Sequence, residues 1–395
     1  MHDGHRDAAP LPDRVPLHTI AREWTRLGCI GFGGPPTHVT LLRRLCVEER
    51  AWLEAEEFED GIAATNLLPG PASTQLAIFC AWKLRGAPGA VLGGLCFIIP
   101  GLVLIIGLSA VFLASRPPTW ILGAAAGAGA AVPAVAISAA WGLAPASWRR
   151  SGEKRAPRAR WLAYVAAGAL AAATVGQLLA AVLLVCGVIE ILVRRRSAPA
   201  PKSARAVLPA VVVHGVALGG LGALAFVALK VGALSYGGGF VIVPLMQHDA
   251  VATYHWMSGS QFLDAVALGQ VTPGPVVQTV AVVGYAAAGV GGALLAAAIA
   301  FAPSFVFVLL GGPRFDVIRR NTSVQSFFSG AGPAVIGAIA GSAIPLGREL
   351  SHLWQLPLLA GAGLWLFVFR RGVVSALFLA GLVGILAVVV GAPIR

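Results

Sequence analysis

Two stretches that interrupt apolar sequence carry the backbone features best suited to binding. They are Asn66-Leu-Leu-Pro-Gly-Pro-Ala-Ser-Thr-Gln75 and Gln270-Val-Thr-Pro-Gly-Pro-Val-Val-Gln278. Each proline removes a backbone donor and pushes the preceding residue to extended geometry, so a helix must break at each Pro-Gly-Pro (PGP) sequence. Inside a membrane, unpaired backbone groups are tolerated only where they are buried in protein or line a cavity. The two PGP breaks therefore predict a binding site.

Side chains around the two breaks complete this first set of candidates. An amide stands three residues before each PGP, and small or polar residues open the next helical run. The candidate binding residues of the two stretches are Asn66, Pro69, Gly70, Pro71, Ser73, Thr74 and Gln75, and Gln270, Pro273, Gly274, Pro275 and Gln278.

Glycine-rich sequence forms a second pair of helix breaks. Phe32-Gly-Gly-Pro35 and Tyr236-Gly-Gly238 each end an apolar run, so Gly33, Gly34, Gly237 and Gly238 join the candidates. Arg26 and Lys230 each stand six residues before these breaks. A charge in an apolar run usually faces a pathway or a partner, so both are binding candidates, with a structural ion pair as the alternative. Asp60 and Asp264 form the other matched charged pair. They could be counter-charges that neutralise Arg26 and Lys230 in the empty state, or they could carry coupling protons.

The composition is that of a membrane protein. The chain has 395 residues, of which 57% are hydrophobic and 12% charged, which is too apolar for a soluble protein of this length. The net charge of +12 comes mainly from short loops, where basic residues set membrane orientation. It therefore does not indicate a nucleic-acid partner. The five cysteines form no CxxC or Cys/His cluster, and we expect no metal and no cofactor.

The apolar runs indicate an all-α polytopic membrane protein with about 10–13 membrane segments. We expect a disordered cytoplasmic tail over residues 1–16, a first repeat over 17–193, a basic linker over 194–206 and a second repeat over 207–395. The run 17–30 is helical but charged. The run 161–193 could fold back as two short helices. Each PGP break is either a re-entrant hairpin, which we favour, or a broken spanning helix.

The two halves are an internal repeat. They align without a gap over some seventy positions at an offset of 204 residues, including Trp52 with Trp256, Asp60 with Asp264 and Phe97 with Phe301. Basic residues lie on opposite sides of the matching segments near 87–113 and 289–311. Since such residues mark the cytoplasmic side, the repeats are predicted to have inverted topology, with helices broken at the FGG and PGP motifs and a site at the repeat interface.

The sequence resembles the chromate ion transporter family in its long, two-domain form. The resemblance is carried by Phe32-Gly-Gly-Pro35, the charged stretch from Arg43 to Arg50, Trp52, Leu67-Leu-Pro-Gly-Pro-Ala-Ser73, Tyr236-Gly-Gly238 and Thr272-Pro-Gly-Pro275. It covers nearly the whole chain. It implies export of chromate, a sulfate-like oxyanion, across the bacterial inner membrane, and a role in chromate resistance. For such an anion, helix N-termini offer free N–H groups and the positive end of the helix dipole.

The resulting hypothesis is a secondary-active, multi-pass transporter that is not an enzyme. Its partners are the oxyanion and membrane lipid, with a homodimer possible. One alternative makes sulfate or another oxyanion the physiological substrate. A channel is a further alternative. An alternative of a different class is a membrane-bound oxyanion reductase, which would need a flavin, haem or metal site.

Overall fold

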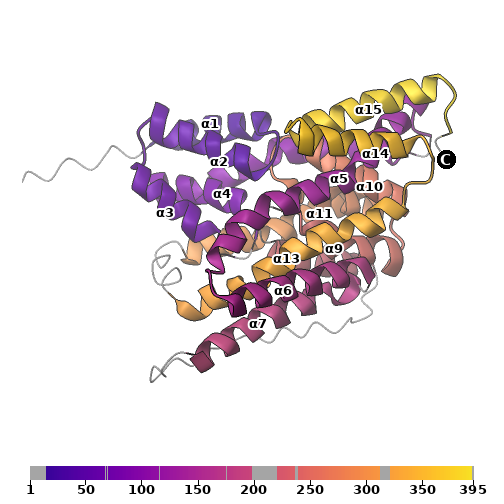
Figure 1. The fold of residues 1–395 in the computed structure, drawn as a ribbon. Coiled ribbons are helices and arrows are strands. Elements are labelled where there is room, and N and C mark those ends of the chain that lie inside the picture. Colours follow the sequence, from indigo (N-terminus) through magenta and orange to yellow (C-terminus); the bar gives the residue numbers. More distant parts are fainter. Residues whose placement is uncertain are drawn as a thin grey trace, which may run out of the picture.

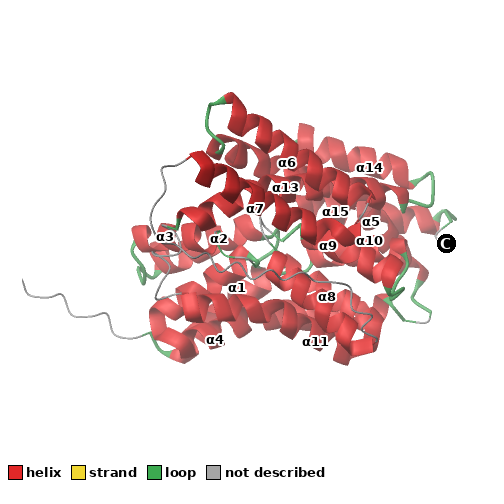
Figure 2. Ribbon diagram, turned by 90° about the horizontal axis from the view of Figure 1, so that it is seen from below, coloured by secondary structure: helices red, strands yellow, loops and turns green. Residues whose placement is uncertain are grey.

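The computed structural model describes residues 15–66, 68, 70–114, 116–174, 176–197, 220–235, 239–311 and 321–393. Three predicted site residues, Pro69, Gly237 and Gly238, lie outside these ranges, as do residues 1–14 of the tail and 198–206 of the linker. The described residues form helices and connecting loops, without a β-strand (Figures 1 and 2). The predicted all-α class is confirmed.

The first half follows the predicted order of segments. Its elements are α1 (Leu17–Ile30), α2 (Pro35–Arg43), the π-helix η1 (Arg44–Glu49), α3 (Ala55–Thr65), α4 (Ala72–Phe112), α5 (Thr119–Arg150), α6 (Arg155–Thr174), the 3₁₀ turn η2 (Gly176–Leu178) and α7 (Leu179–Ser197). The run 161–193 is two helices, as predicted. They lie antiparallel, because Arg160 and Tyr164 near the start of α6 bond to Glu190 near the end of α7.

The second half repeats this order over its described residues. Its elements are α8 (Gly220–Leu234), α9 (Ile242–Gln247), the π-helix η3 (His248–Thr253), α10 (Gly259–Val271), the 3₁₀ turn η4 (Val276–Gln278), α11 (Thr279–Gly311), α13 (Thr322–Arg348), α14 (Gln355–Gly363), the π-helix η6 (Leu364–Val368) and α15 (Val373–Val389).

Helix length and apolarity fit a membrane. Within the described part of the chain, four helices are long and apolar enough to span a bilayer: α4, α5, α13, and α11 together with the η4 turn. Shorter apolar helices are α8, α14 with η6, and α15. Many large apolar side chains on these helices are exposed, for example Val103, Leu310 and Phe378. Such surfaces are expected where lipid, rather than water, is the solvent.

Backbone irregularities recur at the predicted offset of 204 residues. The π-helices η1 and η3 begin at positions 44 and 248. Each is followed by a residue with left-handed φ, Ala51 at +47° and His255 at +53°. Non-glycine residues seldom adopt this conformation, because the Cβ atom crowds the backbone. The repeat therefore extends to local backbone shape.

The ungapped alignment of the halves is wrong by one residue beyond the PGP breaks. The helices α4 and α11 each bend sharply at a glycine, Gly86 with φ +62° and Gly289 with φ +61°. These bends differ by 203 positions (289 − 86), not 204. The first helix starts directly after its PGP as α-helix, whereas the second starts with the 3₁₀ turn η4. The second half is thus one residue shorter at this point.

Close helix contacts give the same offset of 203. A Cβ atom on Gly28 would collide with the carbonyl oxygen of Phe97, and one on Gly232 with the carbonyl oxygen of Ala300. Ala300, and not the expected Phe301, therefore corresponds to Phe97. The glycines let α1 approach α4, and α8 approach α11, within backbone contact distance, as small residues do in membrane helices.

The halves exchange helices. The first-half helix α5 packs against α14 and α15 of the second half, while α13 of the second half packs against α6 and α7 of the first. Figure 1 shows α13 lying along α6, and α15 at the opposite side of the molecule. The corresponding helices α5 and α13 also contact each other, as do α4 and α11.

The corresponding helices α5 and α13 run in opposite directions. Ser147 and Arg150 in the last turns of α5 line the same cavity as Gln325 and Ser329 in the first turns of α13. Since α5 and α13 occupy matching places in the two halves, this arrangement is the one expected of inverted repeats.

Candidate functional site at the helix breaks

Two reciprocal hydrogen bonds join the PGP loop of each half to the glycine-rich break of the other. Gly70 N donates to Ser235 O at 3.1 Å, and Gly274 N donates to Gly31 O at 2.9 Å. Both members differ by 204 positions (274 − 70 and 235 − 31), so the two bonds are equivalent under exchange of the halves. The four breaks that were singled out in the sequence therefore meet in two matched pairs.

Glycine is required at the centre of both loops. Gly70 has φ of +123° and Gly274 has φ of +95°, a region that L side chains rarely adopt. An added Cβ on Gly70 would collide with the side-chain amide of Gln75 and lie 3.3 Å from Ser304 Oγ. Ser304 belongs to α11 of the other half, so the loop is pressed between two halves.

The second PGP loop is packed in the same manner against α4. A Cβ on Gly101 would collide with the carbonyl oxygen of Pro273, and Gln278 Nε2 donates to Ile98 O at 2.8 Å. Gly101 and Ser304 differ by 203 positions, the offset that applies beyond the breaks. Gln75 and Gln278 are equivalent by the same count, and both are fully buried.

Several buried polar atoms that have no hydrogen-bond partner among the described residues gather at these elements. They are Thr74 Oγ1, Ser235 Oγ, Gln270 Nε2, Gln278 Oε1 and Ser304 Oγ. Each residue is in a break, directly beside one, or pressed against one. A buried polar group without a partner costs about 1–3 kcal/mol, and so many at one locus indicate a ligand or water that completes them. Four of the five atoms can donate a hydrogen bond, and Gln278 Oε1 accepts.

The helices after the PGP breaks begin without a side-chain cap. Pro71 precedes α4 and Pro275 precedes η4, and neither forms a capping hydrogen bond. The first backbone N–H groups of such helices have no partner within the helix and carry partial positive charge. Together with the hydroxyl and amide donors, they suit an anion.

His38 connects the breaks of the first half, a role that sequence reasoning did not assign to it. Its side chain is 1% exposed. Nε2 lies 2.9 Å from Gly31 O, which also accepts from Gly274, and Nδ1 lies 3.2 Å from Ser73 Oγ. A neutral imidazole that donates from Nε2 and accepts at Nδ1 satisfies both contacts. His38 thus holds the first-half loop in place.

The predicted charged pair is not arranged as expected. Lys230 bonds to Asp249, with both side chains 12% exposed, whereas Arg26 is 62% exposed and lies 3.6 Å from Glu23. Each cation has a carboxylate partner other than Asp60 or Asp264, so the expected counter-charge pairing is wrong. The acidic residue that neutralises Lys230 lies in the π-helix η3, a position that the ungapped repeat pairs with Leu45.

The remaining candidates differ in burial. Asn66, Asp60 and Gly33 are exposed, whereas Gly34, Pro71, Ser73 and the second PGP are buried. Asp264 lies on α10, with Oδ1 2.7 Å from the place of a Cβ on Gly129 of α5. Of the two matched amides, Asn66 and Gln270, only Gln270 is buried.

A cavity of about 710 Å³ opens beside the first glycine-rich break. It is lined by Phe32, Gly33 and Thr37, and by the start of α15 from Gly372 to Ser375 with Phe378. Because both elements line this cavity, the glycine-rich break of the first half lies next to α15, the last helix of the second half.

Sequence reasoning missed Ser235, Ser304 and His38. Ser235 directly precedes the second glycine-rich motif, and His38 follows the first by three residues, so proximity to a motif could have identified both. Ser304 stands inside an apolar span next to Pro303, and its role depends on a contact between the halves that no local pattern reveals.

Comparison with known proteins gives the family. The family model for the chromate transporter matches residues 18–215 and 222–385. A chromate transport protein of Cupriavidus metallidurans is 31% identical over 340 residues, which cover 84% of this chain and 83% of the relative. A chromate transport protein of Pseudomonas aeruginosa is 30% identical over 408 residues, covering 97% of this chain and 94% of the relative.

A probable chromate transport protein of Synechococcus elongatus is 29% identical over 350 residues, covering 85% of this chain and 86% of the relative. No solved structure is significantly similar to this chain. The family model covers most of the sequence, and the relatives are matched along most of their own length. This chain belongs to the chromate transporter family.

Proposed function

We propose that this protein exports chromate across the bacterial inner membrane as a secondary-active transporter, and thereby confers chromate resistance. The observation that carries the proposal is the reciprocal docking of the PGP loops, which gathers buried, unpartnered donors at the contact between the halves. Family membership supplies the substrate class, because the curated relatives are named for chromate transport.

In this proposal, neutral donors hold the anion. Backbone N–H groups after Pro71 and Pro275 supply partial positive charge, and Thr74, Ser235 and Ser304 supply hydroxyl groups. No formal cation is needed in direct contact, since Lys230 is already neutralised by Asp249. A site without a fixed cation would bind a divalent anion weakly enough to release it on the far side of the membrane.

In this proposal, alternating access comes from movement of one half of the chain against the other. The inverted-topology plan is supported by the opposite directions of α5 and α13 and by the exchange of helices between halves. In transporters of this plan, one repeat or bundle rocks against the other around a fixed site. Breaking one of the two reciprocal hydrogen bonds while keeping the other would open the site to one side of the membrane.

Sulfate or another tetrahedral oxyanion stays the second candidate substrate. Hydroxyl and amide donors recognise oxyanion oxygens of either ion, and no buried site atom distinguishes chromium from sulfur. The alternative of an oxyanion reductase has less support, because the relatives are named as transport proteins.

The test is uptake of radiolabelled chromate into inverted vesicles. We expect saturable uptake that depends on an imposed gradient and that excess sulfate reduces by competition. Uptake that rises linearly with concentration would indicate a channel, and uptake no faster than in vesicles without the protein would overturn the proposal.

A further inference from the structure

A cavity of about 340 Å³ lies away from the helix breaks, where the ends of four helices meet. The last turns of α5 and α7 and the first turns of α6 and α13 form its walls. The residues lining it are Ser147, Arg150, Ser151, Pro157, Trp161, Tyr164, Glu190, Arg194, Gln325, Phe328 and Ser329.

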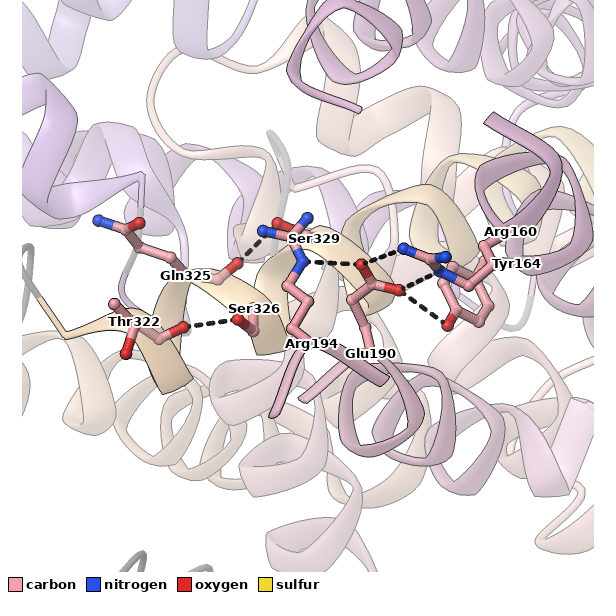
Figure 3. A network of polar contacts seen from close by, with 8 residues as sticks. All are labelled: Arg160, Tyr164, Glu190, Arg194, Thr322, Gln325, Ser326 and Ser329. Atoms are coloured by element: carbon pink, nitrogen blue, oxygen red, sulfur yellow. Dashed lines mark hydrogen bonds and ion pairs between the residues drawn. The ribbon is translucent and has the colours of Figure 1, made fainter. Parts of the chain in front are cut away.

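One buried carboxylate organises the cations of this cavity. The Glu190 side chain is 4% exposed and accepts from Arg160 Nε at 2.9 Å, from Arg194 Nε at 2.8 Å and from Tyr164 Oη at 3.1 Å. Figure 3 shows the three donors converging on it. Two guanidinium groups around one carboxylate leave one excess positive charge, and Arg150 adds a second.

Several N–H and O–H groups that line the cavity are not used in bonds to the described residues and are available to a ligand. Arg194 uses Nε for Glu190, and neither of its Nη groups bonds to another described residue. Arg150 likewise forms no hydrogen bond or ion pair with the described part of the chain. Ser147 accepts from Trp161 Nε1 at 3.0 Å, which leaves its hydroxyl hydrogen available. Planar guanidinium groups with several donors match the oxygens of a phosphate group.

The surroundings place the cavity at the cytoplasmic membrane edge. Basic residues crowd all three first-half helix ends: Arg149 and Arg150 on α5, Arg155, Arg158 and Arg160 on α6, and Arg194, Arg195 and Arg196 on α7. Such clusters mark the cytoplasmic side. The rings of Trp148 and Trp161, 5.0 Å apart, lie beside the cavity, and tryptophan favours the headgroup level.

We propose that this cavity binds a phosphate group, with Arg150 and Arg194 as its cationic ligands and Ser147 as a hydroxyl donor. An anionic lipid headgroup is the source that the membrane-edge position favours, since basic pockets between membrane helices suit such headgroups. A free phosphate ion has the same binding chemistry and is the other source. This inference is independent of the transported substrate.

The test compares the thermal stability of the full-length protein in nanodiscs of phosphatidylcholine with and without phosphatidylglycerol. A second arm adds inorganic phosphate to the protein in detergent. The test variant carries Arg150→Gln and Arg194→Gln. The matched control carries Arg149→Gln and Arg196→Gln, which removes the same charge from the same helix ends outside the cavity lining.

We expect the melting temperature of the wild type and the control to rise by a few degrees with phosphatidylglycerol, and the test variant to lose most of that rise. A rise with inorganic phosphate that depends on the same two arginines would support the site with a free anion as ligand. An equal rise in the test variant and the wild type, or no rise with either probe, would overturn the proposal.

Discussion

Gly70 donates its backbone N–H to the carbonyl oxygen of Ser235 at 3.1 Å, which ties the PGP loop of one half to the helix end of the other. The equivalent hydrogen bond, from Gly274 N to Gly31 O, ties the second PGP loop to the first half. Because each loop is anchored on the opposite half, a movement of one half against the other must change at least one of these contacts. The proposed substrate site is therefore also the joint between the two proposed moving parts.

Replacing Ser304 with alanine tests the proposed site at a residue of the second half that lies against the PGP loop of the first half. Ser304 Oγ is fully buried and has no hydrogen-bond partner within the part of the chain that the structure describes. If it donates to the anion, the loss of one charge-assisted bond costs about 1.5–3 kcal/mol, which is about a 10- to 100-fold weaker apparent affinity for chromate. The measurement is the concentration dependence of chromate uptake.

The control is Ser342→Ala on α13. Ser342 is also buried, but its hydroxyl bonds to Ile339 O within its own helix. Its replacement should leave the apparent affinity unchanged. Equal affinities in the Ser304 variant and the wild type would remove Ser304 from the site.

The breaks could be predicted from sequence because their cause is local. Proline removes a donor wherever it stands, so PGP marks a helix end without reference to the rest of the chain. The pairing of Gly70 with Ser235 could not be predicted in this way. It joins residues 165 positions apart (235 − 70), and it depends on how the halves pack rather than on any local pattern.

The ion pair of Lys230 predicts a structural role for this lysine. Replacing Lys230 with methionine leaves Asp249 as an unpaired, buried charge, and breaking a buried pair costs about 3–5 kcal/mol at most. We expect a lower melting temperature and lower expression, with little change in chromate affinity of the folded protein. Thermal unfolding and isothermal binding measure the two effects separately.

The double variant Lys230→Met with Asp249→Leu sharpens this test. Removing both charges together should recover most of the lost stability, because no unpaired charge is left. A strong loss of chromate affinity in both variants would instead show that Lys230 binds the anion.

The proposed inverted topology predicts which loops face the cytoplasm. A cysteine in place of Arg116, between α4 and α5, should react with a membrane-impermeant thiol reagent only from outside. A cysteine in place of Ser323, at the start of α13, should react only from the cytoplasm. The five native cysteines would first be replaced. Reaction of both positions from one face would contradict the inverted repeat.

The charged partners show the limit of repeat-based reasoning. Repetition at 204 positions suggested Asp264 for Lys230, because both were matched to charged residues in the first half. The structure pairs Lys230 with Asp249, whose repeat mate is Leu45, and gives Arg26 a neighbour on its own helix. The matched cations of the two halves therefore have carboxylate partners at different positions, and a sequence comparison of the halves cannot show this.

Direct binding measurements test whether the two PGP loops form the chromate site. Isothermal titration of chromate into purified protein would compare the wild type with Gly70→Ala, Gly274→Ala and the control Gly107→Ala. Gly107 lies on α4, and a Cβ atom there would meet nothing within 4 Å. We expect a loss of affinity of about tenfold or more in both loop variants, because alanine cannot keep the left-handed backbone without strain. The affinity of the control should be unchanged. Wild-type affinity in both loop variants, with the proteins folded, would contradict this expectation.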